Sequence, residues 1–214
     1  MVTRSIALLL RPSKAPNLPI SPRDYSSEFH EQFSNALRLY FNQIDNFTTA
    51  LTSTAGGSNL RFPNGAFYDT TTQTAAAINT AYAMKLNSTT VSSEVSVSPS
   101  ANTKIVVGIA GVYNFQFSVQ LDSTTGAAQY IYIWVRVNGA DIPNSASKVA
   151  IQGTAAQSIP SWNFVLPMNA NDSLEFMWAV SDTSVRILAA AAVAPVPAIP
   201  SVIATATFVS ALYN

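Results

Sequence analysis

Apolar and polar side chains alternate strictly along residues 113–121, and this pattern restricts the fold more than any other feature of the chain. In YNFQFSVQL every odd-numbered residue is large and apolar, whereas every even-numbered residue is Asn, Gln or Ser. A period of two residues is that of a β-strand with one buried face and one polar face. The segment therefore predicts a strand that buries Tyr113, Phe115 and Phe117.

The same alternation recurs toward the C-terminus. Apolar residues take every second position in segments 130–137, 162–166, 174–180 and 202–208. Asn138–Gly139 is a strong signal for a tight hairpin turn, and residues 169–172 (NAND) are also typical of a turn. Short strands separated by such turns predict a mainly β protein, in which residues 67–214 form an antiparallel sandwich or jelly roll.

The strand expected over residues 130–137 is apolar on both faces. Its odd-numbered residues are Ile and Val, and its even-numbered residues are aromatic as far as Arg136. Aromatic residues at strand spacing usually lie in a core or an interface, so we expect an obligate homotrimer that covers both faces. The residues expected in the core or the trimer interface are Tyr113, Phe115, Phe117, Tyr130, Tyr132, Trp134 and Trp178. The alternative is that exposed rings stack on sugars of a host-surface glycan.

Residues 23–52 have the pattern of an amphipathic helix. Ser21 precedes Pro22, which matches a capping residue followed by proline at the first helical position. Large apolar residues follow at spacings of 4, 4, 3, 4, 3 and 4, close to the helical period. They are Phe29, Phe33, Leu37, Tyr40, Ile44, Phe47 and Leu51. This stripe is expected to pack either against its own domain or against a helix of another protomer.

The remaining N-terminal segments are predicted to be an arm and a linker. Residues 1–22 contain four prolines and six large aliphatic residues, Ile20 among them. Proline favours extended backbone, so we expect an arm that becomes ordered on a partner; a solvated terminus is the alternative. Residues 53–66 are rich in Gly, Asn and Ser and are predicted to link the helix to the β domain. Ile20 and the helix stripe are the expected anchoring residues.

Composition indicates a protein that functions in an assembly. Charged residues make up 10% of the 214 residues, against roughly 25% in typical soluble proteins, and the formal net charge is zero. A neutral surface with so few charges is poorly soluble by itself, which favours burial against other copies or neighbours. Without a basic excess, binding to nucleic acid through bulk charge is not expected. Three prolines within the apolar segment 187–206 argue against a membrane span.

No catalytic constellation is evident, and we predict a non-enzymatic protein without a cofactor or a metal. One His and no Cys leave few options for zinc binding or cysteine chemistry. His30 lies at the acidic start of the predicted helix, where a solvated or interface histidine is expected. Asp69 with Thr70, and Asp122 with Thr124, carry oxygens that Ca²⁺ accepts, but capping of turns is their commoner use.

Three segments of the β domain resemble a known family. The motif Gly111–Phe117 (GVYNFQF), the hydrophobic strand that ends in Asn138–Gly139, and residues 169–175 (NANDSLE) look like the C1q/TNF-like jelly roll. The resemblance covers roughly residues 70–214 and implies a ten-stranded sandwich that assembles into tight trimers. The chain departs from the family in having no Cys and no collagen-like stalk.

Three other segments are similar to virion structural proteins of tailed bacteriophages, cyanophages among them. They are residues 18–22 (LPISP), 37–46 (LRLYFNQIDN) and 197–203 (PAIPSVI). This resemblance implies a virion component whose partners are other virion proteins of the capsid, tail or collar. The expected role is a head decoration (cement) protein or a short fibre or knob. A receptor-binding fibre head that recognises a host-surface glycan is the alternative.

Overall fold

The computed structural model describes residues 14–52 and 62–212. The chain divides into two compact units, Met1–Arg61 and Phe62–Asn214, which we call the N-terminal unit and the head. The sequence placed the linker as far as residue 66, but residues 64–66 already belong to the first strand of the head. The boundary between the two units therefore lies nearer residue 61.

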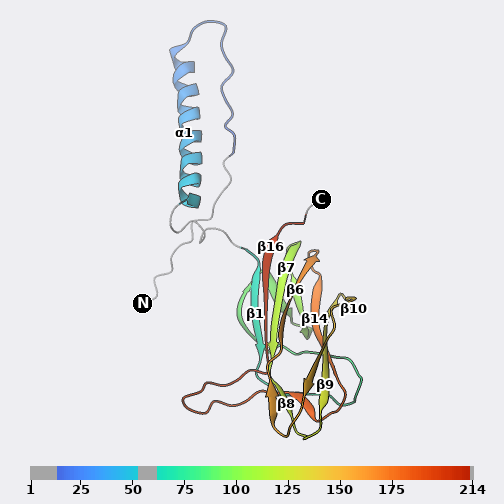
Figure 1. The fold of residues 1–214 in the computed structure, drawn as a ribbon. Coiled ribbons are helices and arrows are strands. Elements are labelled where there is room, and N and C mark those ends of the chain that lie inside the picture. Colours follow the sequence, from blue (N-terminus) through green and yellow to red (C-terminus); the bar gives the residue numbers. More distant parts are fainter. Residues whose placement is uncertain (1–13, 53–61, 213–214) are drawn as a thin grey trace. The chain divides into compact units, whose positions relative to one another are not determined.

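Within its described residues, 14–52, the N-terminal unit has one helix, α1 (Ser27–Thr52), and residues 14–26 before it form neither helix nor strand (Figure 1). The predicted start at residue 23 is wrong, because Ser26 and not Ser21 caps the helix. The Ser26 hydroxyl accepts the backbone N–H of Phe29 (3.2 Å), and its carbonyl accepts that of His30 (3.2 Å). The Ser21 hydroxyl instead donates to the carbonyl oxygen of Pro22 (3.3 Å).

The head is built from antiparallel sheets. The five-stranded sheet has the order β13 (Ser161–Met168), β7 (Gly111–Val119), β16 (Val202–Ser210), β1 (Asn64–Asp69) and β4 (Ser88–Ser93). The main path of the seven-stranded sheet has the order β10 (Ala140–Asp141), β9 (Gln129–Val137), β14 (Ser173–Val180), β6 (Ala101–Val107) and β5 (Val95–Ser98). Two further strands complete it: β11 (Ser147–Ile151) pairs with β9, and β3 (Tyr82–Ala83) pairs with β14. A smaller sheet has the order β12 (Ala156–Ser158), β8 (Leu121–Ser123), β15 (Val185–Ile187) and β2 (Gln73–Thr74).

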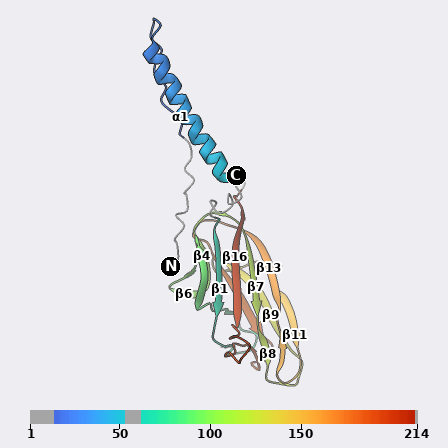
Figure 2. The same ribbon diagram turned by 90° about the vertical axis from the view of Figure 1, so that its left-hand side faces the viewer.

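The path of the chain is that of a jelly roll. The long strands β6, β7, β9, β13, β14 and β16 lie alternately in the seven-stranded and the five-stranded sheet, so that the two sheets face each other. Strands β1 and β16, which open and close the head, are neighbours in the five-stranded sheet, and Figure 2 shows this sheet facing the viewer. The predicted fold class, an antiparallel jelly-roll sandwich preceded by one helix, is confirmed.

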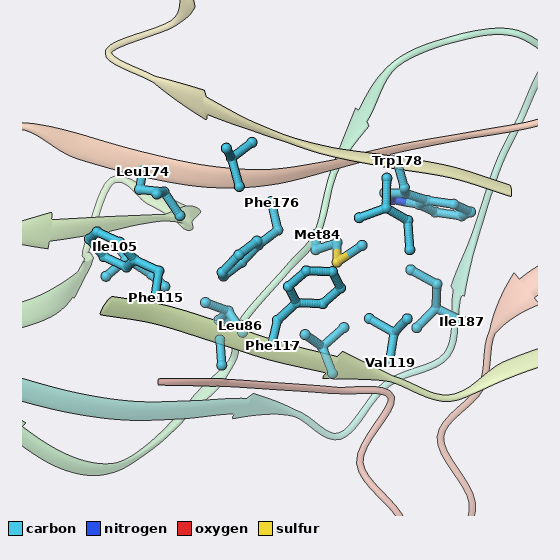
Figure 3. Packing of buried hydrophobic residues seen from close by; sticks show 14 of the residues in the cluster. Met84, Leu86, Ile105, Phe115, Phe117, Val119, Leu174, Phe176, Trp178 and Ile187 are labelled. Carbon is cyan, nitrogen blue, oxygen red and sulfur yellow. The ribbon is translucent and has the colours of Figure 1, made fainter. Parts of the chain in front are cut away.

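The core lies between the two large sheets, where the alternating residues meet. Tyr113 and Phe115 of β7 are 0% exposed, and Leu174, Phe176 and Trp178 of β14 are also buried. The side chains of the two layers point toward one another, and the ring centroids of Phe117 and Phe176 are 4.7 Å apart (Figure 3). Alternation along single strands therefore identified the buried face correctly.

Two local expectations are also met. Asn138 and Gly139 both have positive φ (50° and 82°), as a tight hairpin between β9 and β10 requires, and Asn171 (φ 71°) lies in the turn before β14. The apolar segment 187–206 contains the end of β15, the start of β16 and an irregular loop between them. Among the described residues, no helix is long and apolar enough to cross a membrane.

Candidate assembly surfaces and polar clusters

Four of the seven aromatic residues expected in the core or the trimer interface lie in the core of the protomer. They are Tyr113, Phe115, Phe117 and Trp178, and none is more than 3% exposed. The Tyr113 hydroxyl donates to the carbonyl oxygen of Ile109 (2.7 Å). Burial, and to a smaller extent the negative charge of Glu94, raise the pKa of Tyr113, so the phenol stays neutral. These four residues stabilise the sandwich and do not reach another protomer.

The other three, Tyr130, Tyr132 and Trp134, lie on the outer face of β9 and are only partly covered. Lys148, opposite Tyr132 in β11, holds its ammonium group 3.7 Å from the Tyr130 ring centroid and 5.8 Å from that of Tyr132. This is the geometry of a cation–π contact. A sugar stacked on this side of the Tyr130 ring would have to displace Lys148.

Trp134 is bound by a polar cluster at the end of the same strand. Its indole Nε1 donates to Asp141 Oδ1 (2.8 Å), and Arg136 Nε donates to the same oxygen (2.8 Å). The hydrogen bond from Arg136, followed by that from Trp134, holds the pKa of Asp141 below its ordinary value. The aromatic face of β9 thus has polar partners within its own protomer.

The aspartates considered for Ca²⁺ have other roles. The Asp122 side chain is 5% exposed, and its Oδ2 accepts a hydrogen bond from Arg186 Nε (2.6 Å), so its charge is paired. Asp69 Oδ1 accepts the backbone N–H of Thr71 (2.6 Å) and also the Thr71 hydroxyl, as a turn-capping residue does. No cluster of three potential metal ligands from His, Cys, Asp and Glu occurs in the described part of the chain.

The outer face of the five-stranded sheet carries no charged side chain. The one charged residue in its five strands is Asp69, which is 1% exposed. Val165 (56% exposed), Ile203 (43%) and Val209 (56%) are exposed on these strands. A shallow hollow beside Ile203 is lined in part by Gln116 and Asn163. The seven-stranded sheet differs, since its strands contain Lys104, Arg136, Asp141, Lys148 and Glu175.

The surface on the five-stranded sheet was missed by sequence reasoning, which identified only a polar face on residues 113–121 and assigned no contact to it. The available signal was the lack of Lys, Arg, Asp and Glu in residues 113–119, 162–166 and 202–208, where alternating strands were already predicted. Solvated faces usually carry such charges. The contact of Lys148 with Tyr130 gives no comparable signal, because it depends on the pairing of β9 with β11.

In the N-terminal unit, every predicted anchoring residue is at least partly exposed. Ile20 is 94% exposed, and no residue of α1 is buried. All seven members of the helix stripe are half-buried: Phe29, Phe33, Leu37, Tyr40, Ile44, Phe47 and Leu51. His30 is exposed, with ring centroids 5.1 Å from Tyr25 and 5.5 Å from Phe29. Most of the predicted arm, residues 1–13, lies outside the described residues.

A scan against models of protein families and a search of curated proteins found no match. Among solved structures, the chain is similar to the globular domain of zebrafish complement 1qA protein, with 10% sequence identity and a TM-score of 0.43. This similarity covers 71% of the present chain and 100% of the complement chain. The jelly-roll fold of the head is assigned from its own strand order and register.

Proposed function

We propose that the protein is a non-enzymatic structural component of a bacteriophage virion, a homotrimer that its N-terminal unit anchors to the particle. The observation that carries the proposal is the uncharged outer face of the five-stranded sheet, on which Val165, Ile203 and Val209 are exposed. A face of this kind is expected to contact another protein surface. The expected role is head decoration (cement) or a short fibre or knob, in line with the resemblance of residues 18–22, 37–46 and 197–203 to tailed-phage virion proteins.

The chemistry of this face suits contact between identical chains. Burial of a large aliphatic side chain contributes roughly 1.5–3 kcal/mol when it starts fully exposed, and about half of that from the partial exposure of Ile203. No charge has to be desolvated, which removes the main penalty of a buried polar interface. The amides of Gln116 and Asn163 can form hydrogen bonds across the contact. That three chains assemble, and not two, is inferred from the resemblance to the C1q/TNF-like jelly roll.

Attachment through the N-terminal unit is supported by its exposed apolar side chains. Residues 1–22 contain six large aliphatic residues and only three charged ones, Arg4, Arg11 and Lys14. In the described part of this segment, Leu18 is 45% exposed and Ile20 is 94% exposed. Apolar contacts are not screened by salt, whereas contacts between exposed charges are. Attachment is therefore expected to persist at high salt.

The test compares the full chain with its head, residues 62–214, on particles that lack the protein. The head is a suitable fragment because, among its described residues, every buried hydrophobic side chain lies between Phe67 and Ala206, and all of them except Met177 belong to one cluster. After sedimentation in low salt and in molar salt, the full chain should be found with the particles and the head in the supernatant. Ile20→Asp in the full chain is the matched variant, since this exposed residue can change without disturbing the fold. Equal recovery of chain and head would place the attachment surface on the jelly roll.

A host-surface glycan remains the alternative partner for the head. The Tyr130 ring that would stack on a sugar is already in contact with Lys148, which makes this alternative the weaker one. Electron microscopy of the intact particle distinguishes the roles. A high copy number over the capsid indicates decoration, and a low copy number at the tail or collar indicates a fibre or knob.

A further inference from the structure

The apolar stripe of α1 follows a heptad repeat from Phe33 onward. Its steps are 4, 3, 4, 3 and 4 residues, so the large side chains alternate between the d and a positions of a coiled-coil heptad. The d positions are Phe33, Tyr40 and Phe47, and the a positions are Leu37, Ile44 and Leu51. The first step, of four residues between Phe29 and Phe33, is the one that departs from this alternation. We propose that α1 forms a parallel three-helix coiled coil with α1 of two other copies, an inference that rests on the homotrimer proposed above.

The charges of α1 lie away from this seam. The helix contains four charged residues, and the heptad places Glu31, Arg38 and Asp45 at b positions and Glu28 at an f position. Positions b and f are farthest from the a/d seam. Contact with identical helices is compatible with this arrangement, because like charges do not meet when the copies are brought together.

The positions beside the seam favour three helices over two. The e and g positions from 34 to 50 are uncharged: Ser34, Ala36, Phe41, Gln43, Thr48 and Ala50. The uncharged surface of α1 is therefore wider than a strict a/d stripe, and Phe41 at an e position is 56% exposed. A third helix covers more of the e and g positions than a single partner does. The small residues Ala36 and Ser34 allow the neighbouring helices to approach closely.

The length of α1 explains why the coiled coil would form only when the heads bring three helices together. A helix of 26 residues is about 39 Å long, and its regular heptad pattern is shorter than the three to four repeats expected of an independent coiled coil. Nine residues, 53–61, join α1 to the head. A trimeric head would hold three helices at high effective concentration, so their association becomes an intramolecular step.

The N-terminal unit then has two partners. The stripe of α1 contacts other copies of the chain, which leaves the segment before the helix for the particle. In that segment Ile20 is 94% exposed and Tyr25 is 84% exposed.

The chain has no Cys, so single cysteine substitutions give a direct test in the full-length protein. In a parallel coiled coil, equivalent a positions of different copies lie in one layer. Leu37→Cys and Ile44→Cys should therefore form disulfide-linked dimers under mild oxidation, with the third chain left unlinked. Asn42→Cys, at an exposed f position, is the matched control. Its disulfide should form more slowly than those at positions 37 and 44, by a factor of about ten or more. Non-reducing electrophoresis measures the linked fraction.

The native mass of each reduced variant separates the two proposals. Trimeric mass with linking no faster at positions 37 and 44 than at position 42 would overturn the coiled coil and leave the homotrimer in place. Single-chain mass would overturn the homotrimer itself, and the coiled coil with it. Because α1 contributes no residue to the buried cluster of the head, these substitutions leave the core of the head unchanged.

Discussion

At the scale of single residues, the aromatic face of β9 is held by specific polar partners. Lys148 covers Tyr130, and Asp141 accepts hydrogen bonds from both Trp134 and Arg136. These contacts let a strand that is apolar on both faces have one face near solvent. They also make Trp134 a reporter of the charge on Asp141.

We expect the indole N–H signal of Trp134 to titrate with Asp141. The partners of Asp141 favour its charged form, so its pKa in the folded protein lies below the ordinary value of about 3.9. The stabilisation that the carboxylate provides is complete above that ordinary pKa and is lost as the pH falls through the lower, folded value. In NMR spectra of the folded protein, the midpoint of the Trp134 signal should therefore lie below about 3.9.

Asp141→Asn removes the titrating group and keeps an oxygen acceptor, so the Trp134 signal should then stay constant with pH. The indole of Trp178 is an internal control, because its Nε1 is buried and has no hydrogen-bond partner among the residues that the structure describes. A Trp134 signal that titrates equally in the variant would contradict the assignment.

At the scale of elements, Gly111 determines how closely two strands approach. A Cβ atom on this residue would lie 2.2 Å from the ring of Phe208 and 2.9 Å from the carbonyl oxygen of Ser210, both in β16. The pairing of β7 with β16 shifts register at this point, between Phe208 and Ser210. The glycine that opens the GVYNFQF motif is therefore needed for space.

Gly111→Ala should destabilise the head by about 1–3 kcal/mol, because the ring of Phe208 or the backbone of β16 must move. Gly126→Ala is the matched control, since its Cβ would meet only Thr154, at an ordinary contact distance of 3.6 Å. Urea unfolding of both variants measures the difference. Equal midpoints for the two would show that the close approach costs nothing.

The strands were predictable where the pattern lies within one segment of the sequence and needs no information about other segments. The alternation in 113–121 identified the buried side chains, and that in 174–180 identified the residues that face the core, although Glu175 and Met177 on the opposite face are buried too. Asn138–Gly139 identified a hairpin. The predicted starts of α1 and β1 were wrong. The start of α1 depends on which serine caps the helix, and the start of β1 depends on pairing with another strand. Two serines compete to cap the helix, and residues 64–66 look like linker until β4 pairs with them.

The polar pairs of the candidate sites were beyond sequence reasoning for a related reason. Asp122 and Arg186 are 64 residues apart in the chain and meet only because β8 pairs with β15. Nothing local to either residue indicates the other. The uncharged outer face of the five-stranded sheet is different, since it follows from composition once the strands and their outward positions are known.

At the scale of the whole molecule, the two large sheets of the head differ in charge, and this difference identifies the surface proposed to contact other copies. Thr205→Arg places a charge at the centre of the uncharged face, opposite Gln116 of β7. An unpaired charge buried in an interface costs about 3–5 kcal/mol, so the variant should dissociate into folded single chains. Ser96→Arg is the matched control, because this exposed residue lies on β5 of the other sheet.

Native mass, measured by light scattering at micromolar concentration, tests the central claim most directly. We predict three times the chain mass of 22.8 kDa for the full-length protein and for Ser96→Arg, and a single-chain mass for Thr205→Arg. A folded full-length protein with the mass of one chain would contradict the claim that the uncharged face joins three copies.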